Sequence, residues 1–187
     1  MDRRRLIAGL GAATAGLAAA APALARDGAA SPASAATATT ASAPLNLGHG
    51  PRSLKFRHLH TMEDLEVVYW ENGDYVPESL AAINHLLRDF RSNEVHEIDR
   101  TLLDLLYALH RRVDSKEPYR IISAYRSPAT NGQLTERSGE VAVRSLHMEG
   151  QAVDVRLVDV ALTDLRDAAL RLGKGGVGYY PDSDFVH

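Results

Sequence analysis

The sequence predicts an α+β domain, in which a small antiparallel sheet has helices packed on it. Two observations favour this fold class. Short apolar or alternating segments typical of strands open the folded region and return in its second half, and segments with helical spacing lie between them. This order differs from the regular alternation of strand and helix that indicates a doubly wound parallel sheet.

Two strands are expected at the start of the folded region. Residues 53–60 alternate between apolar and polar side chains, which is typical of a strand with one buried face. Residues 65–70 form a second apolar segment, and Asn72-Gly73 directly after it is a turn signal. The chain therefore begins with two neighbouring strands.

Two helices are expected next. Pro77 and Glu78 are typical of a helix start, and the apolar residues after them recur at helical spacing. A second, longer apolar stripe follows, with Asp99 and Arg100 on its polar side. The stripes consist of Leu80, Ile83, Leu87 and Phe90 in the first helix, and Ile98, Leu102, Leu105, Leu106, Leu109 and Val113 in the second.

The second half of the domain is predicted to contain most of the remaining strands. Residues 119–124 form a short apolar strand, and the turn-forming residues between 127 and 132 predict a loop after it. A helix is expected over 164–172, with its N-cap at Thr163 and its end at Gly173. Residues 177–180 and 185–187 are expected to be the last strands.

Composition excludes several classes of site and partner. The net charge of -3 and the scattered Lys and Arg residues argue against nucleic acid as a partner. The chain contains no cysteine, so disulfides and thiolate metal sites are excluded. A metal site would therefore use His, Asp or Glu, and eight histidines are available.

The N-terminal segment has the pattern of an export signal. Residues 1–25 contain Arg3-Arg4-Arg5, a weakly apolar Ala and Gly stretch, and a small-x-small cleavage site ending at Ala25. This pattern predicts twin-arginine export to the periplasm, with a general secretory signal or an uncleaved anchor as the alternative. Residues 26–44 are rich in Ala, Ser, Thr and Pro and predict a flexible linker, so the folded domain should span 45–187.

A histidine and an aspartate lie seven residues apart in the segment SLHMEGQAVDV. If Gly150 reverses the chain between two extended segments, residues 145–148 and 151–155, then His147 lies opposite Asp154 with their Cβ atoms about 5 Å apart. That separation suits two ligands of one metal ion. A salt-bridged or hydrogen-bonded pair at a hairpin is the alternative.

The last residues of the sequence offer a third ligand. His187 follows an apolar segment, and Asp184 stands three residues before it. A catalytic zinc has three protein ligands and leaves a fourth position to water, whose pKa it lowers to about 7. Asp184 could accept a proton from that water if the backbone bends before His187. The alternative is an ordinary acidic turn followed by a solvent-exposed histidine.

These motifs together resemble the zinc D-alanyl-D-alanine metallopeptidases, and within them the twin-arginine-exported murein endopeptidase K group. The likeness covers nearly all of residues 54–187. It is carried by Ser-x-His-x-x-Gly-x-Ala-x-Asp at 145–154, SAYRSPATN at 123–131, Asp-x-x-His at 184–187, and the segments HTMEDLEVVYW and GGVGYYP.

The resemblance implies a set of site residues. It implies zinc ligands at His147, Asp154 and His187, with a general base at Asp184, in a site at the sheet of a D-Ala-D-Ala peptidase or Hedgehog-like fold. Relatives continue past the last histidine, so the resemblance also implies further residues after His187.

Two more residues are implied to act on the substrate. Arg126, in the YRSP segment, is implied to orient the substrate and polarise its carbonyl, and a guanidinium there suits an oxyanion. A surface arginine at a strand end is the alternative. Ser145 is expected to contribute to substrate binding and to orient the ligands through a hydrogen bond.

The activity implied is that of an exported zinc peptidase that hydrolyses amide bonds in the peptide stems of peptidoglycan. Cleavage of cross-links by an endopeptidase is the first expectation. Removal of a terminal D-alanine by a D,D-carboxypeptidase and a non-catalytic, zinc-stabilised wall-binding module are the alternatives. We expect a monomer with no membrane span in the mature chain.

The other histidines are assigned no catalytic role. His58 and His60 lie on one face of the first strand and could chelate a metal as a pair, but sheet packing or hydrogen bonding is favoured because no acidic residue completes a set. His85, His96 and His110 lie off the apolar stripes or at polar helix positions.

Overall fold

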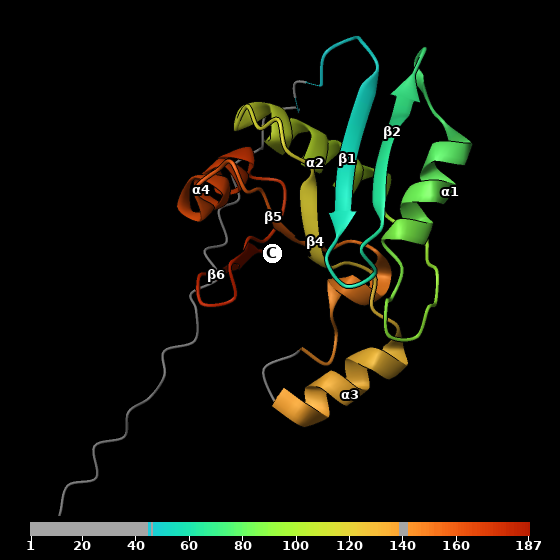
Figure 1. Cartoon of the computed structure of the whole chain (residues 1–187), viewed down its shortest axis with the longest axis vertical. Helices are drawn as coiled ribbons and strands as arrows, with labels where there is room; N and C mark the ends of the chain where they lie inside the picture. The colour runs from blue at the N-terminus through green and yellow to red at the C-terminus, as the bar shows by residue number, and fades with distance from the viewer. Residues whose placement is uncertain (1–44, 46, 139–141) are drawn as a thin grey trace, which may run out of the picture. The chain divides into compact units, whose positions relative to one another are not determined.

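Seven strands form one mixed sheet in the computed structural model (Figure 1). The structure describes residue 45, residues 47–138 and residues 142–187, so the predicted signal peptide, 1–25, and linker, 26–44, lie outside it. The strand order is β3 (Asp74–Tyr75), β2 (Asp64–Glu71), β1 (Arg52–His58), β4 (Tyr119–Ser123), β5 (Asp154–Arg156), β7 (Phe185–Val186) and β6 (Tyr179–Tyr180).

The sequence predicted an antiparallel sheet, but the observed sheet is mixed. β1 and β4 run parallel, with Phe56 opposite Tyr119 and His58 opposite Ile121, whereas the other neighbours are antiparallel. A parallel neighbour requires a long crossover, and here the chain passes through two helices before it enters β4. Apolar alternation reports which face of a strand is buried and carries no information about strand direction.

Among the described residues, four α-helices accompany the sheet: α1 (Pro77–Leu86), α2 (Arg100–Arg112), α3 (Pro128–Ser138) and α4 (Leu162–Leu172). α1 contacts β2, α2 contacts β1 and α4, and α4 contacts β7, so their apolar faces enclose the core with the sheet. α3 instead lies beyond the end of β4, apart from the other helices (Figure 1). In the described part of the chain, no helix has the length and apolarity needed to cross a membrane.

The first two strands and the first two helices agree with the sequence prediction, with shifted ends. β1 stops at His58, and its alternating burial matches the predicted pattern. α1 ends at Leu86, so Phe90 lies outside the helix. Asp99 is the N-cap of α2 and accepts a hydrogen bond from Thr101 N, rather than lying on the polar face of the helix.

The predicted loop at residues 127–132 is wrong, because α3 begins there. Pro128 occupies the first helical position, where its missing N–H is not needed. Ser127 Oγ accepts a hydrogen bond from Thr130 N at 3.2 Å, as an N-cap side chain does. Ser and Pro occur both in turns and at helix starts, so this segment alone does not distinguish them.

The predicted cap of the last helix is also wrong, although its end is confirmed. α4 begins at Leu162 with Ala161 at the N-cap, two residues before the predicted cap at Thr163. Gly173 ends the helix in the left-handed conformation with φ 61°, which glycine adopts at little cost.

The predicted hairpin around Gly150 is wrong as well. Residues Leu146–Glu149 form a 3₁₀ turn, η1, and β5 pairs with β4 and β7 rather than with the preceding segment. Gly150 does reverse the chain, with φ 65°, but it does so as the cap of η1. Ser145 caps the start of the same turn, which favours a helical turn over an extended strand.

Candidate metal centre

Three side chains from separate segments converge where β5 begins and β7 ends. His147 comes from η1, Asp154 is the first residue of β5, and His187 follows β7. Asp154 Oδ1 lies 2.8 Å from His187 Nδ1 and 3.5 Å from His147 Nε2, and the two imidazole nitrogens are 3.2 Å apart. Each residue thus offers one donor atom to the same point in space.

The orientation of His147 is fixed by backbone contacts. Its ring is buried, and Nδ1 lies 2.6 Å from the carbonyl oxygen of Ala124, just after β4. A carbonyl only accepts hydrogen bonds, so Nδ1 is the donor, and Nε2 is turned toward Asp154 and His187. A histidine that ligates a metal is commonly held in this way by a hydrogen bond from its other nitrogen.

Asp154 is held in its charged form. Burial by itself would raise the pKa of this carboxyl group, but hydrogen bonds and charges from His147 and His187 outweigh that effect and lower the pKa to about 2. Asp154 is therefore an anionic oxygen donor at neutral pH.

The donor set fits a small divalent cation. Zinc bonds of about 2.0 to 2.2 Å place tetrahedral ligand atoms about 3.3 to 3.6 Å apart, and the separations here are 2.8, 3.2 and 3.5 Å. Two imidazoles and one carboxylate are ligand types that zinc accepts, and three protein ligands leave a position for water. The group could therefore hold a metal ion.

Gly150 sets the position of η1, and we expect its replacement by alanine to destabilise the fold. A Cβ at this residue would clash with the backbone oxygen of Glu97, and φ of +65° disfavours any side chain. We expect Gly150→Ala to lower the free energy of unfolding by about 2 to 4 kcal/mol in urea titrations. Gly132→Ala in α3, where a Cβ meets no atom within 4 Å, is the matched control and should be neutral or stabilising. Equal stability of the two variants would contradict this account of Gly150.

Arg126 forms one hydrogen bond to a residue of the candidate centre and one to α3. Its backbone N–H donates to the carbonyl oxygen of His147 at 3.1 Å, and its guanidinium donates to Asn131 Oδ1 at 3.3 Å. Burial lowers the pKa of Arg126, and the negative charge of Asp154 opposes that shift. Arg126 Nε is buried without a hydrogen-bond partner among the described residues, so this guanidinium has an unused donor.

Ser145 acts on the backbone of the same turn. Its Oγ accepts a hydrogen bond from His147 N at 3.4 Å and caps η1. The role of Ser145 in orienting a metal ligand remains a prediction. A contact between Ser145 and substrate remains a prediction.

Asp184 lies in the turn that precedes β7 and is not part of the converging group. Its N–H donates to the carbonyl oxygen of Pro181, and its φ of 54° gives the bend that the sequence required before His187. The carboxylate is largely exposed and forms an ion pair with Arg156, with Oδ1 2.9 Å from Nε. Its role as general base remains a prediction.

Comparison with known proteins assigns the family. The family model described as peptidoglycan L,D-endopeptidase MepK matches residues 46–187. The chain belongs to the MepK family of peptidases. Peptidoglycan L,D-endopeptidase MepK of Escherichia coli K12 is 44% identical over 137 residues, which cover 73% of this chain and 75% of the relative. The probable MepK of Haemophilus influenzae is 36% identical over 138 residues, 73% of this chain and 74% of the relative. No solved structure matches this chain.

An apolar cavity lies next to the candidate centre of this MepK-family chain. It has a volume of about 350 Å³ and is lined by residues of α2, α4, β5 and β7, including Leu106, Val155 and Ala169, with His187 at its wall. Its lining is mostly apolar and suits methyl and methylene groups of a peptide, with Asp99 and Lys174 as its charged members.

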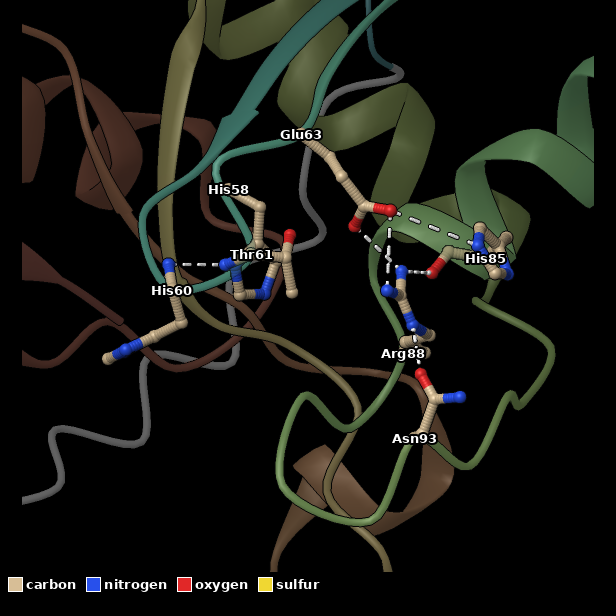
Figure 2. Close-up of polar contacts among 7 residues, drawn as sticks. All are labelled: His58, His60, Thr61, Glu63, His85, Arg88 and Asn93. Atoms are coloured by element: carbon tan, nitrogen blue, oxygen red, sulfur yellow. Dashed lines mark hydrogen bonds and ion pairs between the residues drawn. The ribbon is translucent and has the colours of Figure 1, made fainter.

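The remaining histidines do not form a second metal group among the described residues. His58 is buried, and its Nδ1 accepts hydrogen bonds from the N–H groups of His60 and Thr61 (Figure 2). Burial and the neighbouring charges of His60 and Arg88 lower the pKa of His58 to about 4, so it is neutral at pH 7. This agrees with the hydrogen-bonding role predicted from the sequence.

Sequence reasoning missed Asp89, a buried carboxylate that organises the Arg126 loop of this MepK-family chain. It accepts hydrogen bonds from Ser127 N at 2.9 Å and Ser127 Oγ at 2.8 Å. It also caps its own turn by accepting from the N–H groups of Arg91 and Ser92. An aspartate that bonds backbone N–H groups two and three residues later forms an Asx turn, and this local pattern was the available signal.

Proposed function

We propose that this chain is an exported zinc peptidase that cleaves amide bonds in the cross-linked peptide stems of peptidoglycan, in the periplasm. The observation that carries the proposal is the convergence of His147, Asp154 and His187 in a member of the MepK family. The relatives are named L,D-endopeptidases, which favours an internal bond next to a D-configured residue over a terminal one.

Zinc is the metal proposed for this donor set, with His147 Nε2, Asp154 Oδ1 and His187 Nδ1 as its ligands. When bound, zinc polarises a carbonyl and lowers the pKa of a bound water to about 7. The chain itself supplies the fixed geometry, because Ala124 holds the imidazole of His147 and strand pairing holds Asp154.

Arg126 is proposed to stabilise the negative charge that develops on the scissile carbonyl oxygen. Its backbone hydrogen bond to His147 and its Nε, which has no hydrogen-bond partner among the described residues, support this role. Loss of one such donor costs about 100- to 1,000-fold in rate.

Asp184 is proposed to accept and return the proton. Its side chain would need to leave Arg156 and turn toward the centre, and its exposure, 67% of the side chain, leaves room for that rotation.

Digestion of purified muropeptides tests the proposal. The protein is stripped of metal by a chelator, then supplied with zinc, and the products are weighed by mass spectrometry. We expect cross-linked dimers to fall to monomers only with zinc, because the three ligands alone supply no Lewis acid.

Other products would select the alternatives. Pentapeptides that lose a single alanine would indicate a D,D-carboxypeptidase. Intact dimers in the presence of bound zinc, together with retention on purified sacculi, would indicate a wall-binding module and would contradict the proposed activity.

A further inference from the structure

Asp89 holds two arginine-bearing segments in a fixed relation. Its Oδ2 accepts from Ser127, the neighbour of Arg126, and its Oδ1 accepts from the backbone N–H of Arg91 at 2.9 Å. Asp89 is only 1% exposed, and its bonds to Ser127 are buried. The backbone of Arg91 and that of Ser127, next to Arg126, are therefore hydrogen-bonded to the same carboxylate.

The side chain of Arg91 is positioned by an aromatic stack. Its Cζ lies 4.1 Å from the ring centre of Phe90, and the Phe90 ring stacks on His60 with centroids 3.9 Å apart and an angle of 8° between the planes. A guanidinium over an aromatic face keeps its N–H groups free at the rim for an anion.

The segment that contains Phe90 and Arg91 is braced on its other side. Arg88 pairs with Glu63 at 2.8 Å and donates to the carbonyl oxygen of His85 and to Asn93 Oδ1, as Figure 2 shows. These contacts connect the turn after β1 with the segment after α1. Arg91 is thus exposed but extends from a well-anchored backbone.

Neither arginine is neutralised in the described part of the chain. No carboxylate lies within ion-pair distance of the Arg91 or Arg126 guanidinium there. The backbone of Arg91 and that of Ser127, the residue after Arg126, are both hydrogen-bonded to Asp89, which brings the two arginine-bearing segments to one carboxylate. Guanidinium groups that lack a carboxylate partner are suited to bind an anion.

We propose that Arg91 binds a free carboxylate of the stem peptide next to the scissile amide, and so makes the enzyme prefer substrates with a carboxylate over those with a carboxamide at that position. The proposal rests on the peptidase function proposed above. In this arrangement Arg126 contacts the scissile carbonyl. Arg91 binds the neighbouring carboxylate and thereby sets the direction in which the peptide lies across the site. The apolar cavity beside His187 is left for uncharged parts of the substrate.

Paired substrates test the proposal. Two stem peptides that differ only in a carboxylate or a carboxamide beside the scissile bond are hydrolysed by zinc-loaded parent, Arg91→Ala and Arg91→Lys proteins. We expect Arg91→Ala to lower kcat/KM for the carboxylate peptide about tenfold, mainly through KM, because a partly exposed charge-assisted hydrogen bond is lost. For the carboxamide peptide, kcat/KM should change less than twofold. Arg91→Lys should retain part of the preference.

The matched control is Arg112→Ala, which removes the same charge from the exposed last turn of α2. It should leave both substrates unaffected. Equal losses on both peptides, or no loss on either, would overturn the role of Arg91 while leaving the peptidase function standing. A zinc-loaded parent that hydrolyses neither peptide nor cross-linked muropeptides would overturn the peptidase function, and the role of Arg91 with it. Thermal melts and zinc content show that each variant is folded and loaded.

Discussion

Replacing His147 by alanine is expected to abolish hydrolysis and to remove the bound metal while leaving the fold largely intact. The substitution removes one of three donor atoms that lie 2.8 to 3.5 Å apart. Loss of a residue that merely orients a ligand costs about 10- to 100-fold in metal affinity or activity, and loss of a ligand itself should cost more. We therefore expect a decrease in kcat/KM of more than about 100-fold.

Zinc titration and rates on cross-linked muropeptides measure this effect in the same preparation. His85→Ala is the matched control, because His85 is exposed on α1 and contacts Glu63 only at 4.0 Å. That variant should bind zinc and hydrolyse substrate as the parent does. Full activity of His147→Ala with bound zinc would refute the proposed centre.

Periodicity predicted the elements better than it predicted their pairing. The alternation from Leu54 to His58 and the stripe from Leu102 to Leu109 each report burial, and burial determines the element. The parallel pairing of β1 with β4 follows from the route of the chain through α1 and α2, which no local pattern encodes.

The sequence predicted which residues form the candidate metal centre but not the local backbone structure that brings them together. His147 and Asp154 meet as expected, yet they do so through a capped 3₁₀ turn and a strand held by β4 and β7 rather than through a hairpin. The separation of seven residues is compatible with both arrangements. Tertiary pairing decides between them, because β5 needs neighbours that lie far away in the sequence.

Replacing Asp89 by alanine is expected to cause the largest loss of stability. The substitution removes the acceptor for Arg91 N, Ser92 N, Ser127 N and Ser127 Oγ. Buried donors without a partner cost about 1 to 3 kcal/mol each, and partial relaxation should limit the total to about 3 to 5 kcal/mol. Urea titration of the zinc-loaded protein measures this change. Asp89→Asn keeps one accepting oxygen and should cost less.

The pH dependence of stability gives a second measure of Asp89. Burial would raise its pKa, but hydrogen bonds from Thr130, Ser127 and Arg91 outweigh burial and hold the pKa well below its usual range. A carboxyl group whose pKa is lower in the folded state stabilises the fold above its unfolded pKa of about 4, and this contribution is lost as the pH falls toward the folded value. The parent should therefore lose more stability than Asp89→Ala between about pH 5 and pH 2.

Asp159→Ala distinguishes burial from hydrogen bonding as the source of this stability. Asp159 also accepts from a serine hydroxyl and a backbone N–H, those of Ser115 and Lys116, at 2.7 and 2.9 Å, but it is exposed at the surface. Water can replace the lost acceptor there, so we expect a cost of only about 1 kcal/mol. A loss for Asp89→Ala no greater than that for Asp159→Ala would show that the Asp89 bonds do not anchor the loop. Because Asp89 fastens the segments of Arg91 and Arg126 together, Asp89→Ala should also lower kcat/KM under conditions in which the protein remains folded and zinc-loaded.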